Sequence, residues 1–155
     1  MSSTEVMSEL KERLTTNALK IARDGFGVRL DFSNASIDKV ESILGQIHGE
    51  YQRTQNDEGL RGVAVSFAAY VISVIEKIST PGVWKRDHET IGPETFPYEW
   101  NGTTIFPYGW CLKRVLDGEP DNVAVKYRAL VLEKLAPTDA GSTAESRKKW
   151  WQFWR

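Results

Sequence analysis

Residues 96–110 read Phe96-Pro97-Tyr98-Glu99-Trp100-Asn101-Gly102-Thr103-Thr104-Ile105-Phe106-Pro107-Tyr108-Gly109-Trp110. The motif Phe-Pro-Tyr-x-Trp occurs twice in this stretch, ten residues apart, and Asn101-Gly102 lies between the two copies. Asn and Gly both tolerate the positive φ angles of a type I′ turn, and aromatic residues are enriched in strands. The stretch therefore predicts a β-hairpin with a two-residue loop.

The loop also predicts which residues of the hairpin face each other. The expected pairs are Trp100 with Thr103, Tyr98 with Ile105, and Phe96 with Pro107. Because side chains alternate along a strand, the three aromatic residues of the first strand should share one face of the sheet, and Phe106 and Tyr108 the other.

These rings have two interpretations. Packing in the core is the favoured one, since large aromatic side chains dominate protein interiors. The alternative is an exposed aromatic face that binds a partner, because exposed apolar patches usually mark interaction surfaces. In that case Tyr98, Trp100 and Tyr108 are the candidate partner-binding residues.

Hydrophobic residues at helical spacing predict five helices around the hairpin. The helices cover residues 4–24, 33–51, 60–78, 109–117 and 121–135. Ser33 and Asp121 are the expected N-caps of the second and fifth helices. A short alternation at 27–32 predicts an edge strand, and residues 83–88 and 95–108 predict a three-stranded antiparallel β-meander. We therefore expect an α+β fold with three N-terminal helices, the meander and two C-terminal helices.

Composition places the chain among ordinary globular proteins. Its 155 residues suffice for one domain, which we assign to residues 1–135, and 41% are hydrophobic and 26% charged. The formal net charge of −1 argues against a broad nucleic-acid-binding surface. Bulk charge therefore does not select the partners of this protein.

Cys111 is the only cysteine, which excludes an intramolecular disulfide and a cysteine-rich metal site. The N-terminal residues 1–12 lack the apolar core of a signal peptide, and no stretch approaches the roughly 18 apolar residues of a membrane span. These features favour a cytoplasmic protein.

The C-terminal residues differ in composition from the rest of the chain. Residues 136–146 are small and polar, which is typical of a flexible linker, and we expect the whole segment after residue 135 to be a disordered tail. Residues 147–155 then concentrate three of the six tryptophans beside four positive charges. Leaving so many rings in water is unfavourable, so we expect this segment to dock on another surface.

Three surfaces are considered for this docking. A groove on a partner protein ranks first, because Trp and Arg dominate binding hot spots. The body of the chain itself ranks second, and an anionic membrane surface third, since one short segment without an acyl chain is a marginal anchor. The residues expected to make the contact are Trp150, Trp151, Phe153 and Trp154, with Lys148 and Lys149 beside them.

Three stretches of the chain form a recognisable pattern. They are Leu30-Asp31-Phe32-Ser33, then Ala69-Tyr70-Val71-Ile72-Ser73-Val74-Ile75 with Gly82-Val83-Trp84, and finally Phe106-Pro107-Tyr108 running into Lys113-Arg114-Val115-Leu116-Asp117-Gly118. With these stretches the chain resembles an uncharacterised bacterial family, a domain of unknown function, over about residues 30–135. The resemblance implies a fold and no activity or site residues. Ser73-Val74 stands where the pattern of that family has Gly-Glu.

Candidate catalytic residues are few. His48 and His88 are the only histidines, and neither has a second ligand or an orienting partner at helical spacing, so ordinary surface residues are the favoured interpretation. Cys111 lies near a helix start, which can lower a thiol pKa, but a buried structural cysteine is favoured because no histidine accompanies it. Positive charges at Lys113, Arg114, Lys126 and Arg128 are interpreted as a solvated helix face. We expect no metal and no cofactor.

The chain is therefore expected to be a non-catalytic accessory, adaptor or immunity-type protein that binds another protein through its aromatic hairpin, its C-terminal segment or both. One alternative is a small enzyme, such as a hydrolase, with a pocket between the meander and the C-terminal helices. Its pocket residues would be Tyr98, Trp110, Cys111 and Lys113. The other alternative is peripheral membrane association through residues 147–155.

Overall fold

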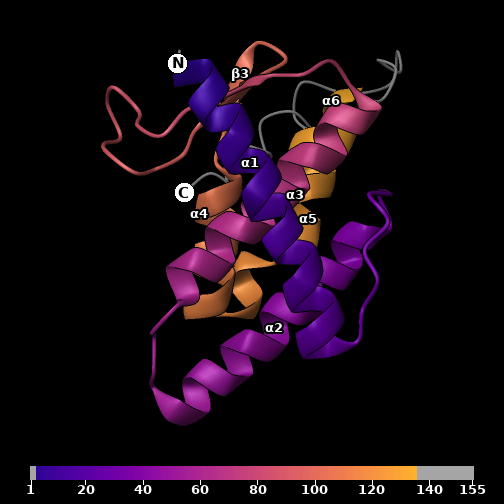
Figure 1. Cartoon of the computed structure of the whole chain (residues 1–155), viewed down its shortest axis with the longest axis vertical. Helices are drawn as coiled ribbons and strands as arrows, with labels where there is room; N and C mark the ends of the chain where they lie inside the picture. The colour runs from indigo at the N-terminus through magenta and orange to yellow at the C-terminus, as the bar shows by residue number, and fades with distance from the viewer. Residues whose placement is uncertain (1–2, 136–155) are drawn as a thin grey trace.

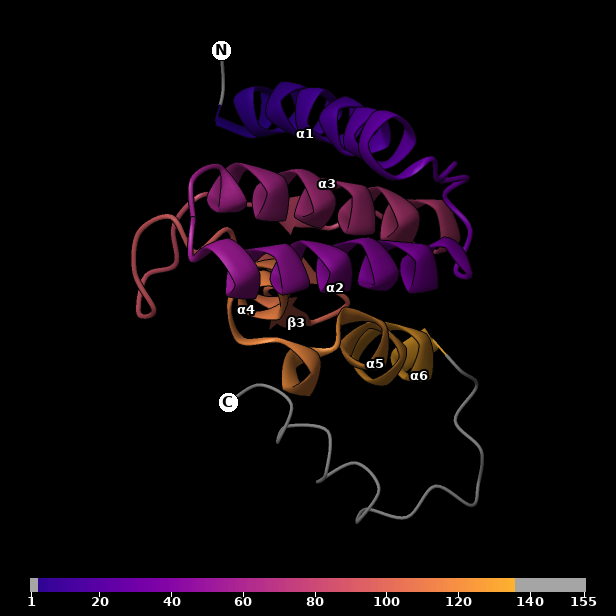
Figure 2. The same ribbon diagram turned by 90° about the horizontal axis from the view of Figure 1, so that it is seen from below.

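Helix α3 (Leu60–Ile78) lies at the centre of the fold, with α1 (Ser3–Lys20) on one side and α4 (Pro107–Asp117) on the other (Figure 1, Figure 2). The structure is a computed structural model that describes residues 3–135. The sequence of α3 is apolar nearly all round, and most of the helix is buried. Because a helix that is hydrophobic on every side must be covered on every side, α3 is the core element around which the others pack.

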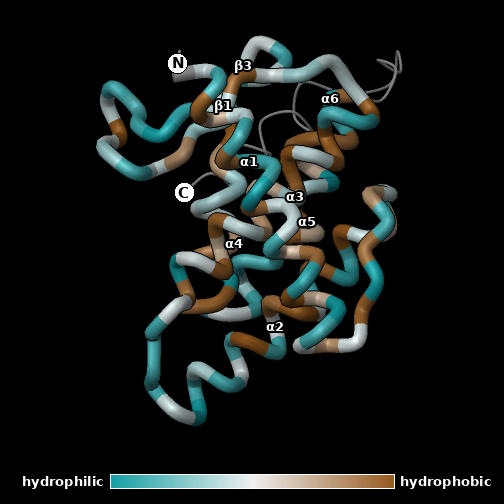
Figure 3. Tube along the Cα trace, viewed as in Figure 1, coloured by the Kyte–Doolittle hydropathy of each residue, from teal (hydrophilic) through white to brown (hydrophobic). Residues whose placement is uncertain are grey.

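The other elements follow in chain order. They are the π-helical η1 (Ile21–Gly25), α2 (Ser36–Thr54), β1 (Val83–Trp84), β2 (Tyr98–Trp100), β3 (Thr103–Ile105), the 3-10 turn η2 (Glu119–Asp121), α5 (Val123–Tyr127), the π-helical η3 (Arg128–Leu132) and α6 (Glu133–Leu135). The α+β class, the N-terminal helices, the three-stranded antiparallel sheet and the C-terminal helices are confirmed. The polar segment between α2 and α3 appears as a hydrophilic loop in Figure 3.

The hairpin has the predicted register. Trp100 pairs with Thr103 and Tyr98 with Ile105, in a sheet of order β1-β2-β3. The loop residues Asn101 and Gly102 have φ angles of 50° and 73°, the signs that a type I′ turn requires.

The hairpin ends earlier than predicted, so the expected pair of Phe96 with Pro107 does not form. Pro107 is the first residue of α4, where its missing N–H is of no consequence. Phe96 has a φ of 49°, which lies outside the range of a strand.

The edge strand predicted over residues 27–32 is wrong. This segment belongs to no sheet, and it runs from η1 to α2 across the end of α3. Phe32 adopts a φ of 62°, and its N–H donates to the Tyr70 hydroxyl at 2.8 Å. A tertiary hydrogen bond to a helix thus replaces the strand ladder.

Both predicted N-caps are wrong, since the N-cap positions are Ala35 for α2 and Asn122 for α5. The Ser33 hydroxyl accepts from the N–H of Ser36 at 3.2 Å, so it supports the start of α2 from three residues before it. The N-cap of α5 is Asn122, whose side chain accepts from Val125 N at 3.0 Å. Asp121 was expected in this role, but its carboxylate pairs with Lys126 instead.

Among residues 3–135, none of the helices combines the length and the apolar character that crossing a membrane requires. The expected linker and tail, residues 136–155, lie outside the described residues.

Candidate functional site

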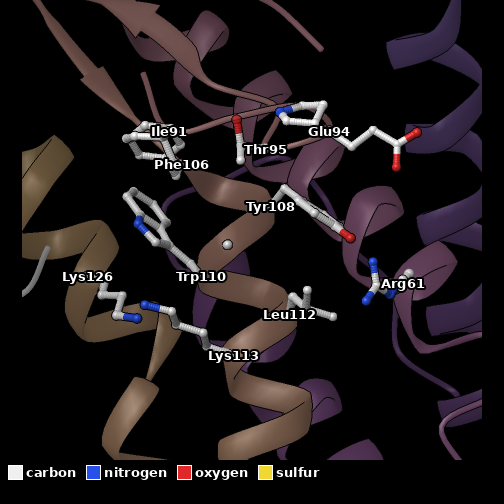
Figure 4. A pocket seen from close by; sticks show the side chains of 12 residues that line it. Arg61, Ile91, Glu94, Thr95, Phe106, Tyr108, Trp110, Leu112, Lys113 and Lys126 are labelled. Atoms are coloured by element: carbon white, nitrogen blue, oxygen red, sulfur yellow. The ribbon is translucent and has the colours of Figure 1, made fainter. Parts of the chain in front are cut away.

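A cavity of about 620 Å³ opens between α4 and the loop that joins β1 to β2 (Figure 4). Three sets of residues line it. The loop contributes Ile91, Pro93, Glu94 and Thr95; α4 and the residue before it contribute Phe106, Tyr108, Gly109, Trp110, Leu112 and Lys113; Arg61 of α3 and Lys126 of α5 complete the wall.

Helical spacing explains which residues of α4 line the pocket. Phe106, Trp110 and Lys113 lie at positions i, i+4 and i+7, which fall on one face of a helix, and Gly109 lies between them. Because Gly109 has no side chain, the helix backbone itself forms part of the wall. The repeated aromatic motif thus serves two purposes: its first copy builds the strand β2, and its second copy starts the pocket helix.

Edge-on and tilted ring contacts hold Tyr108, one of the aromatic residues that line the pocket. The Phe96 ring meets the Tyr108 ring edge-on at a centroid distance of 5.2 Å, and it contacts Trp84 at 5.5 Å. Trp84 Nε1 donates to the Phe96 carbonyl at 3.1 Å. Such contacts add about 0.5–1.5 kcal/mol per ring pair beyond simple burial, so Tyr108 has a fixed orientation.

The loop wall contains two non-glycine residues in the left-handed region. Glu94 has a φ of 54° and Phe96 one of 49°. Left-handed conformations are costly for residues other than Gly, Asn and Asp, and they persist only where the surroundings hold them. Here the N–H of Glu94 donates to Asp87 Oδ1 at 2.8 Å and the N–H of Phe96 to the Arg86 carbonyl at 3.0 Å. Backbone strain of this kind is concentrated at functional sites.

His88 holds the tip of the same loop. Its Nδ1 accepts from the N–H groups of Thr90 at 3.0 Å and Ile91 at 3.1 Å. Nδ1 is therefore the unprotonated nitrogen, and the side chain acts as a cap for the loop. His48 was expected near the exposed side of its helix, but it is half-buried and its Nδ1 lies 2.9 Å from the Val115 carbonyl.

Some charged residues of the pocket form ion pairs and others do not. The Glu94 carboxylate pairs with Arg86 at 2.7 Å, and it raises the pKa of that guanidinium. Arg61 and Lys113 are exposed, and no acidic residue within 3–135 forms an ion pair with either. The open side of the pocket is therefore positively charged.

The predicted solvated helix face is wrong for two of its four residues. Arg114 is buried, and its Nε donates to Glu41 at 2.8 and 3.0 Å. Lys126 is buried beside Asp121, with the ion pair at 3.1 Å. Lys113 and Arg128 are exposed as predicted. The buried pairs join residues that lie on different elements, which helical periodicity alone does not reveal.

The candidate partner-binding rings of the hairpin are core residues. Tyr98 is 0% exposed, Trp100 2% and Tyr108 9%. The Tyr98 hydroxyl accepts from the N–H of Gly82 at 2.7 Å, and Trp100 Nε1 donates to Ser79 Oγ at 3.2 Å. The core interpretation therefore describes all three rings, and only Tyr108 also lines the pocket.

The remaining candidates for partner binding lie outside the described residues. They are Lys148, Lys149, Trp150, Trp151, Phe153 and Trp154.

The pocket considered for an enzyme coincides in part with the observed one. Trp110 and Lys113 line it, but Tyr98 and Cys111 do not. Cys111 is fully buried, and this burial raises the pKa of its thiol well above the ordinary value, so the reactive thiolate is disfavoured. Neither a histidine nor a cysteine lines the pocket, and residues 3–135 contain no cluster of His, Cys, Asp and Glu that could hold a metal ion.

Sequence reasoning missed Arg61 and the loop residues Ile91, Glu94 and Thr95. Arg61 lies in the first turn of α3, far from the hairpin in the chain, and no local pattern connects the two segments. The spacing of Phe106, Trp110 and Lys113 is the one available signal, since it predicts a shared helix face.

Comparison with known proteins finds no matching protein-family model, no matching curated protein sequence and no matching solved structure for this chain. The resemblance to a bacterial family of unknown function stays a prediction.

Proposed function

We propose that this chain is a non-catalytic accessory, adaptor or immunity-type protein that binds another protein, and that the pocket beside α4 receives side chains of that partner. The observation that carries the proposal is an open cavity of about 620 Å³ with aromatic walls and two exposed cations, Arg61 and Lys113.

The residue types of the pocket suit recognition. Aromatic residues and arginine are the groups enriched in protein–protein hot spots, where they lie in desolvated pockets. Cavities of about 300–1,000 Å³ enclose most of a ligand of drug size, so this one has room for more than one side chain. Its walls hold rings, hydroxyls, cations and the Glu94 carboxylate, which can bind and orient a group of the partner.

The loop between β1 and β2, which forms one wall of the pocket, also supports a binding function. Hydrogen bonds from the N–H of Glu94 to Asp87 Oδ1 and from the N–H of Phe96 to the Arg86 carbonyl keep the two left-handed residues of this loop in place. A site whose shape is fixed before binding loses less conformational entropy when the partner arrives. The proposal also keeps residues 147–155 as a second contact, on the basis of their composition alone.

Photo-crosslinking tests this function. With p-benzoylphenylalanine in place of Ile91, which is 58% exposed at the pocket, a protein partner should be crosslinked and then identified by mass spectrometry. The same replacement at Glu12, which is exposed on α1 and does not line the pocket, is the control and should give no such product.

A matched pair of glycine variants then tests the site with the purified partner. Gly109→Leu places a side chain in the pocket on a helix that gains propensity, and it should weaken binding about tenfold or more. Gly49→Leu makes the same change on α2, where a Cβ meets nothing within 4 Å, and should leave the affinity unchanged. Equal affinity of both variants would refute the pocket as the recognition site.

A further inference from the structure

The ammonium groups of Lys113 and Lys126 extend toward each other beneath the Trp110 ring, from two different helices (Figure 4). Lys126 is held in place, since its side chain is only 7% exposed and its Nζ lies 3.1 Å from Asp121 Oδ1. Of these two converging cations, only Lys126 is paired with a carboxylate within the described part of the chain.

We infer that the partner segment entering the pocket is acidic, with a carboxylate bound between Lys113 and Lys126 and a large apolar side chain against Trp110 and Ile91. This inference rests on the proposed function and names the chemistry of the partner.

The charge count of the lining residues supports an anionic occupant. Four charged residues line the pocket, and Glu94 and Lys126 have their charges matched by Arg86 and Asp121. The charges of Arg61 and Lys113 have no such match among residues 3–135. An acidic segment would supply the missing negative charge, and partly enclosed ion pairs are less screened by salt than exposed ones.

The apolar residues next to the lysines indicate that the occupant also carries an apolar side chain. Trp110 is only 5% exposed and lines the pocket, and Ile91, on the loop that lines the same pocket, is 58% exposed. Covering an exposed isoleucine and an indole face gains the hydrophobic free energy of the area removed from water. A neutral polar segment would neither cover the apolar surface of the wall nor neutralise the cations.

Two fluorescent probes with the same ring system test the anion preference. The first is 8-anilinonaphthalene-1-sulfonate, and the second is N-phenyl-1-naphthylamine, which lacks the sulfonate. We expect the sulfonate probe to bind the full-length protein about tenfold more tightly, since only the sulfonate can accept a charge-assisted hydrogen bond from the lysines. This preference should decrease as salt is added.

Variants then assign the binding to the lysine end of the pocket. Lys113→Gln should weaken the sulfonate probe about tenfold and leave the neutral probe unchanged, whereas Lys20→Gln, on the exposed part of α1, should change neither. Gly109→Leu should weaken both probes. Circular dichroism confirms that each variant keeps the fold before it is titrated.

A pair of peptides tests whether the occupant is an acidic peptide segment. Acetyl-Asp-Trp-Glu-amide should displace the sulfonate probe, and its neutral isostere acetyl-Asn-Trp-Gln-amide should not. Displacement by both peptides, or equal affinity for the two fluorescent probes, would overturn the anion preference. If the sulfonate probe binds but neither peptide displaces it, the occupant is a small organic anion and the inference about the partner is wrong.

The outcome of the crosslinking experiment is independent of these titrations. A partner crosslinked at position 91 with no acidic preference in the probes would support the proposed function and overturn this inference alone. Probe binding as expected without a protein crosslink would overturn the proposed function.

Discussion

Arg114 donates from Nε to both carboxylate oxygens of Glu41, at 2.8 and 3.0 Å, and so joins α4 to α2 across 73 positions of the chain. The same carboxylate accepts from the N–H of Val123 at 3.0 Å, which satisfies one of the free donors at the start of α5. The two side chains are only 7% and 12% exposed. One acidic residue of α2 therefore fixes the two helices that carry Lys113 and Lys126.

Replacing Glu41 by Ala should destabilise the protein by about 3–5 kcal/mol, because the buried Arg114 Nε and the N–H of Val123 lose their acceptor and Arg114 keeps only the exposed Glu119 as a partner. Urea unfolding followed by circular dichroism measures the change as a lower midpoint. Glu50→Ala removes the partner of Arg53 in an exposed pair, and its midpoint should stay close to that of the wild type.

A double variant separates charge from packing at this position. Glu41→Leu with Arg114→Met should recover most of the stability lost in Glu41→Ala, since a well-packed apolar pair often replaces a buried ion pair without loss. Equal midpoints for Glu41→Ala and Glu50→Ala would show that the buried pair contributes no more than an exposed one.

The hairpin loop gives a second prediction. Gly102→Val should cost more than about 1 kcal/mol, because a β-branched residue is penalised at the φ of 73° that this position has. A Cβ at Gly102 meets nothing within 4 Å, so the expected loss comes from the backbone conformation and not from a clash.

Alanine substitutions provide the matched comparison for the loop. Gly102→Ala should destabilise the protein, whereas Gly49→Ala in α2 should stabilise it by about 0.5–1 kcal/mol, since Ala is the better helix former. Both positions have open space around a Cβ. Thermal unfolding of the two variants should therefore shift in opposite directions, and a shift in the same direction would contradict the assigned turn.

The sequence predicted the parts of this fold that depend on local chemistry. Asn101-Gly102 defined both the turn and the pairing of Trp100 with Thr103, because a two-residue loop leaves one register. The helices were found from periodicity, since each has an apolar stripe that packs against α3 or its neighbours.

The features that were missed depend on contacts between distant residues. The segment 27–32 alternates like a strand, but no neighbouring strand is available, and the Tyr70 hydroxyl takes its place as acceptor for Phe32. The burial of Arg114 follows from Glu41 on another helix. The pocket likewise needs α3, α4, α5 and the loop together, so no local pattern could predict it.

Buried tyrosines give a third prediction, for alkaline solution. Burial raises the pKa of Tyr98 and of Tyr127 to about 12, from the ordinary 10.0. A group whose pKa is higher in the folded state stabilises the protein fully below its unfolded pKa, and this contribution is lost as the pH rises through the folded pKa. Stability should therefore fall between about pH 10 and pH 12.

Absorbance of tyrosinate at 295 nm and circular dichroism, recorded together, measure this effect. Ionisation of the buried rings should coincide with loss of helical signal. Tyr98→Phe lowers stability at neutral pH, because the N–H of Gly82 loses its acceptor, but it should make the fall above pH 10 less steep. A slope equal to that of the wild type would show that Tyr98 does not contribute to the alkaline transition.

The last prediction concerns residues 136–155. The buried hydrophobic residues within the described part of the chain run from Ala18 to Val131, on the helices and the sheet that surround α3. We expect this core to fold without the C-terminal segment, so deleting residues 136–155 should change the melting temperature by only a few degrees, where 1 kcal/mol corresponds to roughly 2–8 °C. A much larger fall would show that the segment packs against the body of the chain.

The same segment is expected to add affinity for the crosslinked partner. Trp151→Ala with Trp154→Ala should weaken its binding, measured by isothermal titration, and leave the melting temperature unchanged, because aromatic anchors supply most of the affinity of a tethered segment. Lys148→Ala with Lys149→Ala should mainly slow association and reduce its salt dependence. Sedimentation of the wild-type protein with anionic vesicles, combined with unchanged partner affinity in the tryptophan variant, would instead assign the segment to a membrane surface.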